Sequence, residues 1–92
     1  MVHLLNPYTI AQAIHALDSH LLAIELDKHN DQARLIYRYE VAGRIEPFYV
    51  VLTSEPVDSI VTLYPAAQPF EEALHHCYGI EFRPPTALPS TN

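Results

Sequence analysis

Residues 64–82 read YPAAQPFEEALHHCYGIEF, and this stretch decides the fold. Pro69 suits the first turn of a helix, where a missing N–H costs nothing, and Gly79 suits the left-handed residue that ends one. Between them, apolar side chains recur at positions i, i+3, i+4 and i+7, which places on one helix face Phe70, Ala73, Leu74 and Cys77. The opposite face carries Glu71, Glu72, His75 and His76. The pattern predicts an amphipathic helix over residues 68–78 with its carboxylates on the polar face.

The same stretch resembles the signature of the 30 kDa subunit of respiratory complex I, a module that also occurs in energy-converting membrane-bound hydrogenases. The family pattern is roughly Y/F-P-A-A-N-W-Y-E-R-E-I-Y-D-L-F-G-I-x-F. The positions that match it are Pro65, Ala66, Ala67, Glu71, Gly79, Ile80 and Phe82, and the near matches are Gln68, Phe70, Leu74 and Tyr78. The chain departs from the pattern at Pro69, Glu72, Ala73 and His76, and it lacks the arginine-rich segment that follows in the family.

The resemblance implies a short, divergent accessory subunit of a complex-I-like NADH dehydrogenase or hydrogenase. Such a subunit has no catalytic residue, cofactor or metal of its own, since electron transfer belongs to its partners. It would pack against the hydrogenase-like large subunit and neighbouring iron–sulfur subunits, at the cytoplasmic face of the inner membrane. The matching positions imply a docking surface that includes Glu71, Tyr78, Gly79, Ile80 and Phe82.

Composition describes one small acidic domain. With 92 residues the chain suits a single domain, and its formal net charge of −6 argues against a surface for nucleic acid. One cysteine excludes an internal disulfide and a cysteine-rich zinc site. No signal peptide or stretch of about 20 apolar residues is visible, so a cytoplasmic protein without membrane insertion is expected. We expect the domain to span residues 1–82, followed by an extended, mobile, proline-rich tail over 83–92.

The remaining elements predict a two-layer α+β sandwich, with two helices on one face of a mainly antiparallel sheet of about four to five strands. Asn6 and Pro7 begin a helix over residues 7–18, whose apolar stripe includes Ile14 and Leu17. The expected strands are residues 21–27, 33–41, 48–52 as a central strand, 59–63, and 80–82 as a last edge strand. Turns are predicted at residues 29–31 and 42–43. Tyr37 and Tyr39, with Phe48 and Tyr49 on the neighbouring strand, suit core packing, with an aromatic docking face as the alternative.

The titratable side chains favour structural roles. His75, His76 and Cys77 are adjacent, and neighbours on a helix point about 100° apart, so one ion cannot be bound by all three. Cys77 on the apolar face is expected to be buried. Glu71 with His75 and Glu72 with His76 form solvated i, i+4 pairs, or alternatively a pH-sensitive interface. The other carboxylates, Asp58 among them, are expected on solvated surfaces.

Two further functions stay open. One is an independent protein-interaction or regulatory domain, as a homodimer joined through a sheet edge. The other is a small enzyme or metal-binding protein that uses the histidines. No phosphate-binding loop, nucleophile elbow or zinc-ligand spacing supports the latter.

Overall fold

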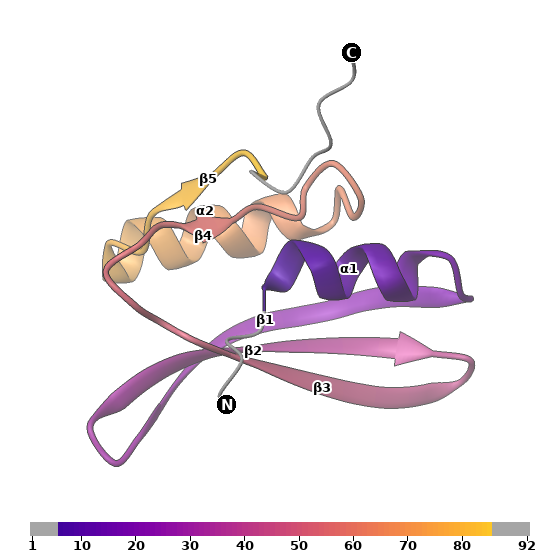
Figure 1. Cartoon of the computed structure of the whole chain (residues 1–92), viewed down its shortest axis with the longest axis horizontal. Coiled ribbons are helices and arrows are strands. Elements are labelled where there is room, and N and C mark those ends of the chain that lie inside the picture. The colour runs from indigo at the N-terminus through magenta and orange to yellow at the C-terminus, as the bar shows by residue number, and fades with distance from the viewer. Residues whose placement is uncertain (1–5, 86–92) are drawn as a thin grey trace.

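The computed structural model describes residues 6–85 and places two helices over one face of a three-stranded antiparallel sheet (Figure 1). The sheet has the order β1-β2-β3, and a separate two-stranded parallel sheet pairs β4 with β5. The elements in chain order are α1 (Pro7–His15), β1 (Ser19–His29), β2 (Gln32–Val41), β3 (Arg44–Val51), β4 (Val57–Asp58), α2 (Ala67–Tyr78) and β5 (Phe82–Arg83). The predicted α+β class is confirmed, but the strands divide between two sheets.

Helix α1 begins as predicted and ends earlier than predicted. The Asn6 side chain caps it by accepting hydrogen bonds from the backbone N–H groups of Tyr8 (2.8 Å) and Thr9 (3.1 Å). The helix ends at His15 instead of residue 18, and the Ser19 hydroxyl donates to the Ile14 carbonyl oxygen where the chain enters β1. The prediction that Leu17 is a core residue is therefore wrong, since Leu17 lies beyond the helix and is 55% exposed.

Two tight turns join the three long strands where the sequence predicts them. Asn30 and Asp31 have φ values of 52° and 64°, and Ala42 and Gly43 have φ values of 52° and 82°. Two successive positive φ values match the right-handed twist of the flanking strands. Ala42 adopts this conformation without the freedom of glycine.

A β-bulge changes which side chains of β1 face the helices. The register shifts between Leu21 and Ala23, so Leu21 and Ile24 are both buried while Leu22 between them is exposed. The predicted alternation, which placed Leu22 on the same side as Ile24, is wrong here because the bulge inserts one unpaired residue.

Strand β3 is an edge strand, whereas the sequence predicted a central one. It begins at Arg44, so Pro47 lies inside the strand, opposite Arg38 of β2. Proline is tolerated there because, among the described residues, β3 pairs with another strand on one side only, so the N–H that proline lacks is not needed on the open side. The run from Phe48 to Leu52 is apolar on both sides because Phe48 packs against the core while Tyr49 covers the outer face, where its ring lies 4.4 Å from the guanidinium carbon of Arg34.

The segment between β3 and α2 differs most from prediction. The expected strand over residues 59–63 is absent, because Leu63 and Tyr64 both donate backbone hydrogen bonds to the Ile60 carbonyl oxygen and form a turn. The strand lies earlier, at Val57–Asp58, and Phe82–Arg83 pairs with it in parallel. Arg83 therefore belongs to β5, while residues 86–92 of the predicted tail lie outside the described part of the chain.

Tyrosines of the central strand form much of the core. Tyr37 and Tyr39 are fully buried together with Leu35, and the Tyr39 ring contacts Phe48 and Tyr64 at centroid distances of 5.9 and 5.2 Å. The core-packing interpretation is confirmed for Tyr37, Tyr39 and Phe48 and is wrong for Tyr49, which is 41% exposed. Among residues 6–85, neither helix is long and apolar enough to cross a membrane.

Candidate functional site

Helix α2 packs on β1 through a face that is rotated from the predicted one. Its buried residues are Ala67, Glu71 and Leu74, whereas Ala73 and Cys77, predicted on the buried side, are exposed. Residues 67, 71 and 74 recur at helical spacing, so a carboxylate occupies a position that the hydrophobic pattern assigned to solvent. The predictions of a buried Cys77 and of a solvated Glu71 are both wrong.

Glu71 anchors α2 to the segment that follows β4. Its side chain is only 6% exposed. Its Oε1 accepts a hydrogen bond from the Ser59 hydroxyl at 2.7 Å, and its Oε2 accepts one from the buried Ile60 backbone N–H at 3.0 Å. The predicted pair with His75 is not formed. Burial raises the pKa of Glu71, and the hydrogen bonds from Ile60 and Ser59 oppose that rise because they favour the ionised form.

Two buried hydroxyls belong to the same polar region. The Tyr37 and Tyr39 hydroxyl groups make no hydrogen bond to the described residues. Burial raises the pKa of both phenols, and the Glu71 carboxylate adds to the rise in each case. Tyr37 and Tyr39 are therefore neutral over the physiological pH range.

A second buried carboxylate joins three distant parts of the chain. Asp58 is 2% exposed and accepts hydrogen bonds from the Asn6 amide at 2.9 Å and from Arg83 Nε at 2.8 Å. The other side of the Arg83 guanidinium lies 3.5 Å from Glu55. The prediction of a solvated Asp58 is wrong, because β5 supplies a cation that compensates its burial.

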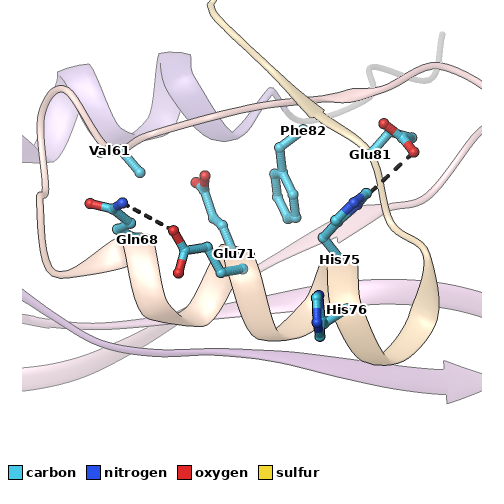
Figure 2. Close-up of a pocket in the computed structure, with 8 residues that line it drawn as sticks. Val61, Gln68, Glu71, His75, His76, Glu81 and Phe82 are labelled. Atoms are coloured by element: carbon cyan, nitrogen blue, oxygen red, sulfur yellow. Dashed lines mark hydrogen bonds and ion pairs between the residues drawn. The ribbon is translucent and has the colours of Figure 1, made fainter.

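A groove opens between α2 and β5, above the buried end of Glu71. We call it the α2–β5 groove; its volume is about 630 Å³, and it is lined chiefly by Val61, Glu71, Glu72, His75, Glu81 and Phe82. Figure 2 shows the Phe82 ring between Glu71 and His75. Gln68 and His76 complete the lining. His75 Nδ1 donates to the Ile80 carbonyl oxygen at 3.0 Å and lies 4.0 Å from the Glu81 carboxylate. These contacts hold the turn after α2 against the helix.

The predicted docking residues differ in their relation to this groove, because only Glu71 and Phe82 are among the residues that line it. Tyr78 is 62% exposed at the end of α2. Gly79 has a φ of 72° and ends the helix as predicted. Ile80 and Phe82 are half-buried and pack against the core, and Glu71 lies beneath the surface. Tyr78 is therefore the large exposed side chain among the five positions.

Sequence reasoning missed the roles of Ser59, Asp58 and Arg83. Their partners lie 12, 52 and 25 residues away along the chain, and no local pattern encodes such contacts. The one available signal was the excess of acidic over basic residues near Arg83, which makes an ion pair with a nearby carboxylate more probable than a free arginine.

Among residues 6–85, no group of three or more His, Cys, Asp or Glu side chains is placed to hold a metal ion. The groove offers carboxylates, an imidazole and an aromatic ring, which suit recognition of a cation. Comparison of the chain with protein-family models, curated proteins and solved structures finds no match.

Proposed function

We propose that this chain is a non-catalytic accessory subunit that packs against the hydrogenase-like large subunit of a complex-I-like dehydrogenase or energy-converting hydrogenase. In this role it holds no cofactor, and the neighbouring iron–sulfur subunits carry the electrons. It lies at the cytoplasmic face of the inner membrane through those partners. The resemblance in residues 64–82 motivates this assignment.

One observation carries the proposal: Tyr78, the last residue of α2, is 62% exposed. Tyrosine is enriched among the residues that dominate binding energy in protein interfaces, because it offers a large rigid surface and a polar tip. The neighbouring motif positions give this surface a rigid support. Ala67 is fully buried, Glu71 anchors the helix, and Gly79 sets the left-handed turn.

The test is co-expression of the full chain with the hydrogenase-like large subunit of the same organism, followed by co-purification. We expect Tyr78→Ala to weaken recovery of the large subunit while leaving the unfolding transition unchanged. Tyr49→Ala is the matched control, because Tyr49 is 41% exposed on the outer face of the sheet. Glu71→Lys is unsuitable as a surface variant, since it would replace a buried hydrogen-bond acceptor by an ammonium group that cannot accept from Ser59 or Ile60. If Tyr78→Ala recovers as much of the large subunit as wild type does, this surface is not the interface.

The free edge of β1 favours a second candidate function, a stand-alone interaction domain that forms a homodimer. Within residues 6–85, β1 is an 11-residue edge strand that pairs only with β2. Exposed edges present unpaired backbone groups to another strand. Light scattering of the purified chain distinguishes the candidates, because a stable dimer in the absence of the large subunit supports the second.

A further inference from the structure

The α2–β5 groove is rich in carboxylates. Glu71, Glu72 and Glu81 all line it, and among residues 6–85 its lining includes no lysine or arginine. Glu72 accepts a hydrogen bond from the neutral Gln68 amide at 3.0 Å, and Glu81 lies 4.0 Å from His75. A concave site lined by one sign of charge concentrates the field and attracts the opposite charge.

Three arginines elsewhere in the described region are paired with carboxylates. Arg34 contacts Asp27 at 2.8 Å, Arg38 contacts Glu25 at 3.1 Å, and Arg83 contacts Asp58 at 2.8 Å. Asp27, Glu25 and Asp58 therefore have guanidinium partners within the chain. The groove contrasts with them, because its exposed carboxylates have only an amide and an imidazole nearby.

The aromatic ring in the groove selects among cations. Phe82 is half-buried and lies between Glu71 and His75 (Figure 2), so one part of the ring packs on the core while the other part faces the groove. A planar guanidinium can stack on an aromatic face and at the same time donate hydrogen bonds, in its own plane, to carboxylates at its edge. An ammonium is a compact, strongly hydrated charge that makes less use of such a surface.

We propose that the α2–β5 groove binds an arginine side chain presented by a protein partner. The guanidinium lies over Phe82 and donates to Glu72 and Glu81, while its aliphatic stem contacts Val61. Glu71 stays bound to Ser59 and Ile60 and acts as a fixed negative charge at the base. This inference rests on the proposed function only for the identity of the partner, because the arginine would then belong to the large subunit.

A titration of the full chain with single amino-acid probes tests the inference without any partner. The isotope-labelled protein is titrated with N-acetyl-arginine methylamide and followed by amide chemical shifts at neutral pH and low salt. The uncharged probe of equal shape is N-acetyl-citrulline methylamide. We expect shifts centred on Glu72, Glu81 and Phe82, and binding of the arginine probe about fivefold or more tighter than that of citrulline, as a cation–π contact of about 1 kcal/mol with added charge attraction requires. Equal binding of both probes, or shifts spread over all acidic residues, would overturn the inference.

Variants assign the binding to the groove. We expect the double substitution Glu72→Gln with Glu81→Gln to abolish the preference for arginine over citrulline, because both side chains keep their shape and lose their charge. Glu46→Gln on β3 is the control that removes one charge outside the groove, and it should keep the preference. Phe82→Leu should reduce the preference for arginine over N-acetyl-lysine methylamide. If Phe82→Leu fails to fold, the Glu72 and Glu81 variants, whose side chains are exposed, decide the question alone.

The outcomes separate this inference from the subunit assignment. Arginine binding in the groove without recovery of the large subunit supports the inference and counts against the assignment. If the double variant recovers the large subunit in undiminished yield, and the wild-type chain shows no preference for arginine over citrulline, the assignment is supported and the inference is overturned.

Discussion

Replacing Glu71 by alanine should destabilise the domain at neutral pH, although the substitution removes a buried charge. The buried Ile60 N–H loses its acceptor, and an unsatisfied buried donor costs about 1–3 kcal/mol. Ser59 is half-buried, so its hydroxyl regains a partner in water and adds little to the loss. Relief of carboxylate burial offsets part of the cost, and we expect a net loss of about 1–2 kcal/mol in the free energy of unfolding.

Glu71→Gln is the matched control. Its amide oxygen accepts from the Ile60 N–H, and its amide nitrogen donates to the Ser59 hydroxyl, so both contacts survive without the charge. Urea unfolding measures the difference; with a denaturant slope of about 1 kcal/mol per M for a small domain, the alanine midpoint should lie about 1–2 M below that of the glutamine variant. Equal midpoints would refute the view that the Ile60 hydrogen bond is what Glu71 supplies.

The same pair of proteins gives a pH prediction with a definite sign. Since burial raises the folded-state pKa of Glu71 above its ordinary value of 4.5, the folded protein binds more protons than the unfolded chain between the two pKa values. The free energy of unfolding of wild type, relative to Glu71→Gln, should therefore fall as pH rises through that window and stay low above it. A relative stability that rises with pH would show that the hydrogen bonds outweigh burial.

Three other predictions concern packing, backbone strain and the ion pair. Leu74→Ala should cost about 2–5 kcal/mol in urea unfolding because Leu74 is buried, whereas Leu17→Ala should change stability by less than about 0.5 kcal/mol; similar effects would show that the assigned core is wrong. Ala42→Gly should raise the melting temperature, because a non-glycine residue in the left-handed region costs about 1 kcal/mol; a lower melting temperature would contradict this. Arg83→Met should lower the melting temperature, and much less so in an Asp58→Asn background, where no buried carboxylate is left uncompensated; additive effects would refute the coupling.

Local signals predicted the start of α1, the end of α2 and the two turns. Asn6 as a cap, Gly79 as a left-handed stop, and the turns at residues 29–31 and 42–43 each depend on a few adjacent residues, so their chemistry is visible in the sequence. The layering followed from apolar periodicity, which needs no knowledge of distant contacts.

The candidate site depended on distant contacts and was mostly not predictable. Periodicity treats every carboxylate as a surface residue, yet Glu71 and Asp58 are buried because Ser59, Ile60, Asn6 and Arg83 meet them. The bulge at Leu22 likewise depends on pairing with β2. The resemblance marked Glu71 as a position of interest, but its role as an internal anchor required the fold.

The junction at Asp58 sets an order for folding during synthesis. The β1–β2–β3 hairpins contain near neighbours in the chain and have low contact order, so they can form as soon as residues up to Val51 have left the ribosome. Asp58 must wait, because Arg83 is translated 25 residues later. Until β5 emerges, a nascent chain keeps this carboxylate hydrated and the parallel pair open, so ribosome-bound chains arrested before residue 83 should retain a protease-sensitive segment after β3.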